Sequence, residues 1–140
     1  MRILIVEHKL DTSVKEEFRA DAEIFAQVLR SWKIPEQLIE RMEVVVEIRD
    51  MIPDGGFGGR NNDRFLIYIH VDFFQGKSTE LNAVIAHELK HLWYLVMMPS
   101  ENMLEREGGF CINRRNYRWE EKECRRMEKK HAHTPFIAPL

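Results

Sequence analysis

The chain has 140 residues, 44% of them hydrophobic, and a chain of this length can bury about two-thirds of its unfolded surface in one compact domain. The formal net charge of -2 gives no whole-chain attraction to nucleic acid or to a membrane surface. No run approaches the roughly 20 apolar residues that cross a bilayer, and the two cysteines, Cys111 and Cys124, form no CxxC pair. We therefore expect a cytoplasmic protein with free thiols, without a membrane partner.

The first part of the chain predicts a short strand followed by a helix. Residues 2–6 are apolar and predict a buried strand. Ser13 and Glu16 match a capping box, in which each side chain satisfies a free backbone donor of the other residue. Apolar residues then recur at helical spacing, so we expect a helix from about 14 to 33. Pro35 ends this helix and opens a second, shorter helical turn.

Two strands, a glycine-rich segment and a long helix are expected next. Residues 44–48 are β-branched and predict a strand. Residues 54–63 hold four glycines and predict a flexible loop, the clearest break in the chain. Residues 64–71 are apolar and aromatic and predict a second strong strand. A helix is expected from 78 to about 98, where Pro99 stops it.

The last part of the chain predicts a loop, a basic helix and a tail. A loop of roughly fifteen residues leads to a helix over about 115–130, and residues 131–140 are expected to be a tail. Residues 112–130 hold eight basic side chains against four glutamates, a local charge of +4. Such a stripe is more often a solvated helix face than a nucleic-acid site. We expect an α+β domain over 1–140, with a small mixed sheet flanked by helices.

The motif HELKH stands within the long helix predicted from residue 78. His87 and His91 lie one helical turn apart and project from the same side, so both imidazoles can bind one tetrahedral zinc ion. Glu88 follows the first histidine and can reach a metal-bound water without being a ligand itself. Zinc lowers the pKa of that water, and a carboxylate can take its proton and pass it to a leaving amine.

The position of Glu88 on the helix supports this interpretation. At about 100° per residue, the apolar residues of this helix form one arc, and Lys90 is expected to point the opposite way. Glu88 falls within the apolar arc, where an unpaired carboxylate is costly. A metal-bound water, a cation or a proton would explain it, and His87 and His91 lie at the edge of the same arc.

A catalytic zinc site needs a third protein ligand. The candidates are the glutamates of 118–130 and the histidines at 131 and 133. Glu121 shares one stripe of the last helix with its least polar residues, which favours it. Glu120 is the alternative, whereas Glu123 and Glu128 fit the solvated side of the helix better.

HExxH on one helix and a glutamate on a later helix about thirty residues on resemble the gluzincin metallopeptidases. The small size, the strand before the HELKH helix and the sequence WEEKEC are similar to the ImmA/IrrE-like bacterial and phage group, over residues 64–130. That group follows its ligand glutamate with a small residue in an ExxA pattern. Glu121 matches this pattern with Cys124 in place of alanine. No histidine follows HELKH until His131, unlike the SprT-like and metzincin patterns.

The resemblance implies a zincin-like fold and a zinc-dependent peptidase with Glu88 as general base and His87, His91 and Glu121 as zinc ligands. It also implies that a peptide substrate adds a strand along residues 64–71, although a buried central strand fits their composition equally. Tyr94, Tyr117, His131 and His133 are candidates for stabilising the oxyanion. The alternative is a catalytically inactive protein whose structural zinc supports binding of a regulatory protein or nucleic acid.

Overall fold

The computed structural model places most of the chain in defined elements. The described residues are 1–8, 10, 14, 16–50, 55–98, 103–106, 109–112 and 114–140. For residues 103–117 the description covers the backbone elements alone. Ser13, half of the expected capping box, lies outside the described residues, as does part of the expected loop before the last helix.

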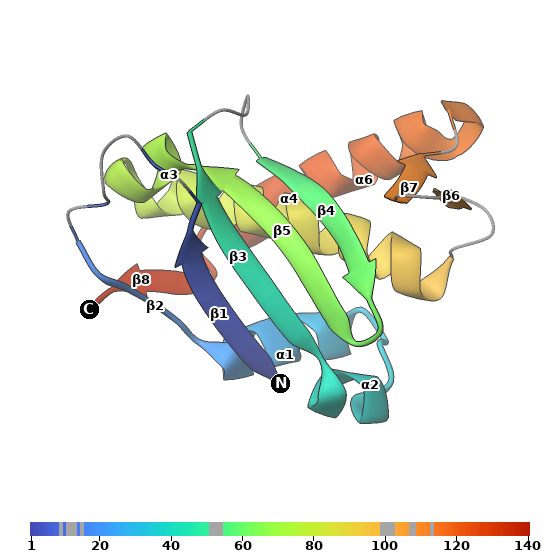
Figure 1. Cartoon of the computed structure of the whole chain (residues 1–140), viewed down its shortest axis with the longest axis horizontal. Helices are drawn as coiled ribbons and strands as arrows, with labels where there is room; N and C mark the ends of the chain where they lie inside the picture. The colour runs from blue at the N-terminus through green and yellow to red at the C-terminus, as the bar shows by residue number, and fades with distance from the viewer. Residues whose placement is uncertain are drawn as a thin grey trace.

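Groups of strands and groups of helices follow one another along the chain (Figure 1). The helices are α1 (Ala22–Ser31), α2 (Glu36–Arg41), α3 (Val71–Gln75), α4 (Ser78–Met97) and α6 (Arg114–His131). The strands are β1 (Arg2–Glu7), β2 (Phe18–Ala20), β3 (Glu43–Arg49), β4 (Gly55–Asn61), β5 (Arg64–His70), β6 (Met103–Arg106), β7 (Gly109–Ile112) and β8 (Ile137–Pro139).

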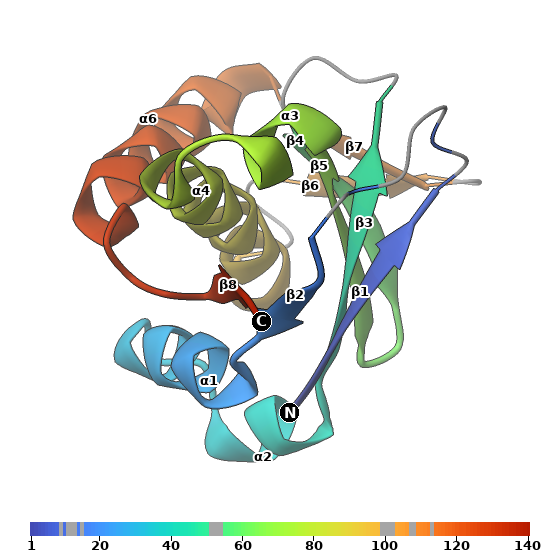
Figure 2. The ribbon, with the colours of Figure 1, turned by 90° about the vertical axis from the view of Figure 1, so that its left-hand side faces the viewer.

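A mixed four-stranded sheet forms one layer of the molecule. Its strand order is β1-β3-β5-β4, with β1, β3 and β5 parallel and β4 antiparallel to β5. Two smaller antiparallel pairs, β2 with β8 and β6 with β7, lie outside it. Turned by 90°, the molecule shows α4 against one face of the sheet and α6 beyond α4 (Figure 2). The expected α+β class with a small mixed sheet and flanking helices is confirmed.

The core lies between this sheet and α4. Alternate residues of β3 and β5 point toward the helix because successive side chains of a strand face opposite sides. They are fully or almost fully buried: Val44, Val46, Ile48, Phe65, Ile67 and Ile69. α4 contributes Leu81, Ile85, Leu89 and Leu92 to the same core. This packing fixes which side of α4 remains for α6.

The first helix is shorter than the sequence predicts. α1 begins after Asp21, whose carboxylate accepts hydrogen bonds from the backbone N–H groups of Glu23 and Ile24. Residues 18–20 are extended and pair with β8 instead, so the predicted helix over 14–33 is wrong in its first turns. A strand partner at the distant C-terminus outweighed the local helical spacing.

Residues 54–63, predicted as a flexible loop, contain strand β4. Its glycines leave room for neighbouring side chains. A Cβ on Gly56 would lie 2.3 Å from the ring of Tyr68. The ring of Tyr68 in turn stacks under the guanidinium of Arg49, 4.4 Å from the ring centroid. The prediction of a loop was wrong, because these residues pair with β5 as a strand. Glycine is present at Gly56 because the ring of Tyr68 occupies the space that a side chain would need.

Strand β5 has partners on both sides. It pairs with β3 through Phe65 and Ile67 and with β4 across a tight turn at Asn62, whose φ is 55°. The strand predicted over 64–71 is present, but it is central and has no free edge for a peptide. Among the described strands, the sheet edge on the side of β5 is β4.

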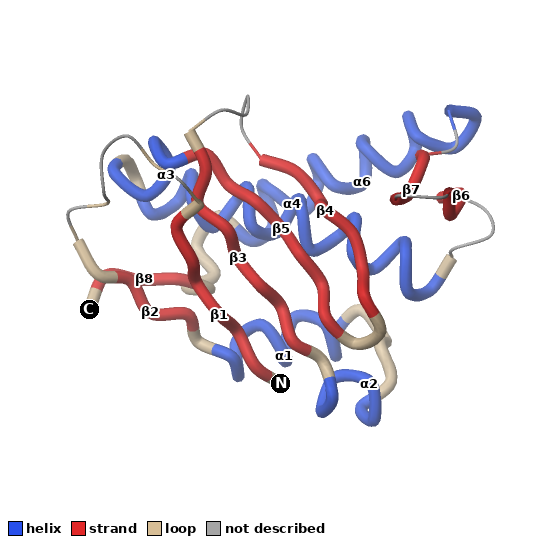
Figure 3. Tube along the Cα trace, in the orientation of Figure 1, coloured by secondary structure: helices blue, strands red, loops and turns tan. Residues whose placement is uncertain are grey.

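The C-terminal residues, predicted as a tail, are part of the fold. Phe136 is fully buried and meets the ring of Phe25 at a centroid distance of 5.0 Å. Asn82 of α4 accepts hydrogen bonds from the backbone N–H groups of Phe136 and Ile137. β8 therefore joins α1, α4 and β2 into one end of the molecule (Figure 3).

Lys90, expected on the side of α4 opposite the apolar arc, is buried by aromatic rings. It is 7% exposed, and its ammonium lies 3.9 Å from the ring centroid of Trp93 and 4.7 Å from that of Trp32. Burial lowers its pKa. The Nε1–H of Trp93 also donates to the carbonyl of Trp32 at 2.7 Å. The rings of Trp32 and Trp93 therefore cover the Lys90 side of α4, and their cation–π contacts replace water around the ammonium.

Phe136→Ala tests the role of the C-terminal segment. Loss of this buried ring should lower the free energy of unfolding by about 3–5 kcal/mol, as for other buried aromatic residues. Leu140→Ala is the control, because Leu140 is 72% exposed and should change stability by less than about 0.5 kcal/mol. Urea denaturation followed by circular dichroism measures both. Equal, small losses would show that 131–140 is a tail.

Candidate metal centre

The contacts between α4 and α6 bring the candidate ligands together. His91 meets Glu120 and Glu121, whereas His87, one turn earlier on α4, meets Glu121 and approaches Glu128. The earlier histidine of α4 approaches the later glutamates of α6, and the later histidine contacts the earlier ones. The two helices therefore run antiparallel (Figure 1). Glu120, Glu121 and Glu128, which span about two turns of α6, therefore face one or both of the histidines.

The carboxylate of Glu121 lies between the two imidazoles. Its Oε1 is 3.0 Å from Nε2 of His87 and 2.6 Å from Nε2 of His91. Its side chain is 17% exposed, at the rim of the helix interface. The hydrogen bond to His91 is the main cause that lowers the pKa of Glu121 to about 2. The three atoms form a compact group, to which Glu121 and His87 contribute partly exposed side chains and His91 a buried one.

Glu120 has a different position from Glu121. It is fully buried, and its Oε2 accepts a hydrogen bond from Nδ1 of His91, on the opposite side of the ring from Glu121. This contact orients the imidazole and makes its Nε2 more basic. Of the two glutamates considered for the third ligand, Glu121 faces both Nε2 atoms and Glu120 supports one histidine from behind.

His91 is held between these two carboxylates. Burial alone would lower its pKa, but hydrogen bonds to Cys124, Glu120 and Glu121 raise it well above the ordinary value. A doubly protonated ring can donate from Nδ1 to Glu120 and from Nε2 to Glu121. That proton would have to leave Nε2 before the nitrogen could bind a metal ion.

Cys124 belongs to the same cluster. Its sulfur and one ring nitrogen each of His87 and His91 all lie within 4.8 Å of one another, and among the described residues these three form a group that could hold a metal ion. Cys124 is fully buried, and burial raises the pKa of its thiol to about 11. Oε1 of Glu121 is also closer than 4.8 Å to a nitrogen of each histidine. Helix α6 therefore offers two candidates, Glu121 and Cys124, for the third ligand.

Glu88 is a buried carboxylate beside this cluster. It is 4% exposed, its Oε2 has no hydrogen-bond partner among the described residues, and its Oε1 lies 3.8 Å from Nε2 of His87. Burial raises its pKa to about 7. Gly55 of β4 packs over it, since a Cβ there would lie 3.7 Å from Cγ of Glu88. Glu88 therefore faces the site from the sheet side of α4.

The other residues considered from the sequence lie elsewhere. Nδ1 of His131 is 3.0 Å from the hydroxyl of Thr134, and its ring packs against Trp32, while His133 is exposed. Tyr94 stacks edge-on against Trp93. The side chain of Tyr117 lies outside the described residues. Apart from Tyr117, none of these residues forms a hydrogen bond or an ion pair with His87 or His91 within the described part of the chain.

Three features of the site were not anticipated. Glu120 lies behind His91 because it is buried deep in the interface between α4 and α6. The spacing of residues along one helix does not predict that depth. Glu128, assigned to the solvated side, has its Oε2 3.8 Å from Nδ1 of His87. Cys124 was interpreted as a small residue after Glu121, although cysteine is itself a metal ligand. That chemical property was the signal that could have found it.

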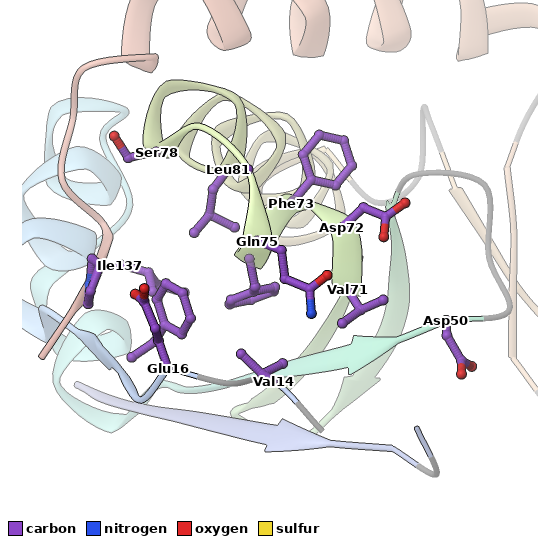
Figure 4. A pocket seen from close by; sticks show the side chains of 14 residues that line it. Val14, Glu16, Asp50, Val71, Asp72, Phe73, Gln75, Ser78, Leu81 and Ile137 are labelled. Atoms are coloured by element: carbon purple, nitrogen blue, oxygen red, sulfur yellow. The ribbon is translucent and has the colours of Figure 1, made fainter. Parts of the chain in front are cut away.

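A cavity of about 700 Å³ lies apart from this centre (Figure 4). Its lining includes Val14, Val71, Asp72, Gln75 and Leu81 but none of the residues of the cluster. Leu81 precedes the first histidine by six residues, about 9 Å along the helix. The volume of this cavity therefore says nothing about the chemistry of the histidine cluster.

Comparison with models of known protein families, with characterised protein sequences and with solved structures gives no match. Among the described helices, none combines the length and the apolar character that crossing a membrane requires. The function of the chain must therefore be argued from the helix interface itself.

Proposed function

We propose that this chain is a zinc-dependent metallopeptidase with a zincin-like fold, in which His87, His91 and Glu121 bind the metal and Glu88 is the general base. The observation that carries the proposal is the convergence of three potential ligand atoms beside the buried carboxylate of Glu88, whose Oε2 has no hydrogen-bond partner among the described residues. The mixed sheet against the HELKH helix is consistent with the fold.

The residues at the site fit a divalent cation of the zinc class. Two imidazole nitrogens and one carboxylate oxygen form a typical donor set for catalytic zinc. Ligand atoms around a tetrahedral zinc lie roughly 3.3 Å apart, and Glu121 Oε1 is already 3.0 Å and 2.6 Å from the two nitrogens. The carboxylate of Glu120 on His91 supplies the outer contact that such histidines usually have.

The charges around the cluster also favour a cation. Glu88, Glu120, Glu121 and Glu128 surround two imidazoles, and buried oxygens of Glu88 and Glu120 have no hydrogen-bond partner among the described residues. Buried, unpartnered carboxylates are costly unless a cation or a proton compensates them. Because metal binding must displace the proton on Nε2 of His91, we expect metal affinity to fall at acidic pH.

Glu88 is placed to move the proton. Zinc bound to the three ligands would lower the pKa of a water molecule toward about 7. Oε2 of Glu88 takes a proton from the attacking water and passes it to the leaving amine nitrogen of the peptide. Burial raises the pKa of Glu88 to about 7, so its carboxylate can accept and release a proton near neutral pH.

The substrate would bind along β4 rather than along β5. An extended peptide can add a strand only where backbone groups are free, and β5 is paired on both sides. β4 forms the edge among the described strands and packs on α4 through Gly55, next to Glu88. A peptide paired with β4 would therefore run past the histidines.

A second candidate function is a non-catalytic zinc protein that binds a regulatory protein or nucleic acid. Cys124 favours it, because a fourth protein ligand would close the position that water needs. The face of α6 exposes Trp119, 72% accessible, together with basic side chains. Binding of nucleic acid to this face would weaken steeply as salt concentration rises.

Glu88→Gln tests the general base. The amide keeps the shape of the side chain but cannot accept the proton, so peptide cleavage should fall about 10²- to 10⁴-fold while bound zinc is unchanged. Cleavage of a fluorogenic peptide library and metal analysis measure the two effects. Glu123→Gln is the control, because Glu123 pairs with Arg126 away from the histidines. An unchanged rate in Glu88→Gln would reject the mechanism.

Substitutions on α6 distinguish the ligand from its neighbour. Glu121→Ala should abolish stoichiometric zinc binding, because it removes one of three ligands. Glu120→Ala should weaken zinc binding roughly 10- to 100-fold, as loss of an outer-shell carboxylate does elsewhere. Competition with a chromophoric chelator gives both affinities. The reverse order, with Glu120→Ala losing zinc and Glu121→Ala retaining it, would exchange the two roles.

The burial of Glu88 predicts a pH dependence of stability in the metal-free protein. Its pKa is raised from 4.5 to about 7 on folding, so the folded state binds more protons between these values. The protonated Glu88 therefore contributes to the free energy of unfolding fully below pH 4.5. As the pH rises to about 7, the free energy of unfolding should fall by about 3 kcal/mol. Urea denaturation should show that loss in wild type but not in Glu88→Gln. Parallel pH profiles would contradict the buried position.

A further inference from the structure

Helix α6 presents two different ligand atoms to the same pair of histidines. Glu121 and Cys124 are three residues apart and so lie on one side of the helix, almost one turn from each other. The Glu121 side chain is 17% exposed at the rim, whereas Cys124 is fully buried at the floor of the interface. The two side chains thus approach the histidines from the solvent side and from the core side.

The position of the thiol relative to both rings sets it apart from a packing cysteine. Its sulfur is within 4.8 Å of a ring nitrogen of His87 and of His91, as those nitrogens are of each other. In a tetrahedral zinc site, sulfur and nitrogen ligands lie about 3.5 Å apart. The sulfur therefore needs to approach each ring nitrogen by at most little more than an ångström, which rotation of a side chain can supply.

The carboxylates provide a second, independent indication that a cation belongs here. Oε2 of Glu88 and Oε1 of Glu120 are buried and have no hydrogen-bond partner among the described residues. Both carboxylates lie beside the cluster: Glu120 contacts the ring of His91, and Oε1 of Glu88 is 3.8 Å from Nε2 of His87. A soft divalent metal ion held by nitrogen and sulfur would compensate their negative charge.

We propose that Cys124 is the fourth protein ligand of the metal, completing a His87, His91, Glu121 and Cys124 centre whose thiolate competes with water for the open position. This proposal rests on the metal centre of the proposed function. The thiol proton passes to solvent as sulfur binds the metal. The chain then has a closed, latent form, and water reaches the metal when the thiolate leaves.

This arrangement has a consequence for metal preference. Thiolate ligands favour zinc, cobalt and cadmium over magnesium, calcium and manganese, which prefer oxygen donors. A centre with Cys124 should therefore exclude the oxygen-preferring ions more strongly than a centre built from Glu121 and the histidines alone. Removal of the thiol should narrow that difference.

Titration of the metal-free protein with Co²⁺ tests the sulfur directly. A cobalt–thiolate bond gives an intense charge-transfer absorption in the near ultraviolet, separate from the weaker visible bands of any tetrahedral cobalt. Wild type should show both. Cys124→Ser and Cys124→Ala should lose the ultraviolet band, keep visible bands and bind Co²⁺ more weakly, by at least the roughly tenfold that loss of an outer-shell partner costs.

Matched variants decide among the outcomes. Cys111→Ser should retain the ultraviolet band, because Cys111 is the other cysteine of the chain. Tetrahedral cobalt without a sulfur band in wild type would overturn the role of Cys124 and leave the histidine and glutamate centre standing. No cobalt binding at all, in wild type as in His87→Ala, would overturn the proposed function as well. Loss of the band in Cys111→Ser alone would assign the sulfur elsewhere.

Discussion

The antiparallel packing of α6 on α4 is the contact on which the candidate site depends. α4 supplies the two histidines and Glu88, and the described side chains that contact these imidazoles from the other helix, Glu120, Glu121 and Cys124, all come from α6. The sheet positions α4, and the buried C-terminal segment after α6 ties its end to α4 through Asn82. A shift of one turn between the helices would separate Glu121 from both imidazoles.

Hydrogen bonds between His91 and the carboxylates of Glu120 and Glu121 connect the two helices without a metal ion. His91 donates to Glu120 on one side and faces Glu121 on the other, and its raised pKa keeps it charged. Glu88 keeps a proton to a higher pH than an exposed glutamate because it is buried. The same groups would exchange protons for a divalent ion, so metal binding, pH and stability are linked at one site.

Local sequence pattern predicted the elements that carry strong periodicity. The strands over 2–6 and 44–48, the HELKH helix and the last helix are found close to their expected bounds, because each packs apolar side chains against the core. The first strand was predicted to be buried, but β1 lies at the edge of the sheet and its residues are only partly buried or exposed. The predictions for segments that depend on distant partners were wrong. Residues 18–20 and 137–139 pair with each other as strands. The glycines of β4 are explained by neighbouring side chains, such as the ring of Tyr68, that leave no room for a Cβ.

The site was predictable to a similar degree. Spacing along one helix placed His87, Glu88 and His91 correctly in relation to each other, and it predicted the burial of Glu88. It favoured Glu121 over Glu120 as a ligand, but it did not predict that Glu120 lies behind His91, because the two glutamates reach different depths of the interface between α4 and α6. It also missed the burial of Lys90, since the aromatic rings that cover its ammonium include Trp32 of a distant segment.

The metal itself is the central claim. Elemental analysis of the purified protein measures zinc per chain directly, with His87→Ala as the comparison. The account predicts about one zinc per chain in wild type and none bound in His87→Ala after identical dialysis. Wild-type protein that binds no zinc, or His87→Ala that retains it fully, would contradict the account.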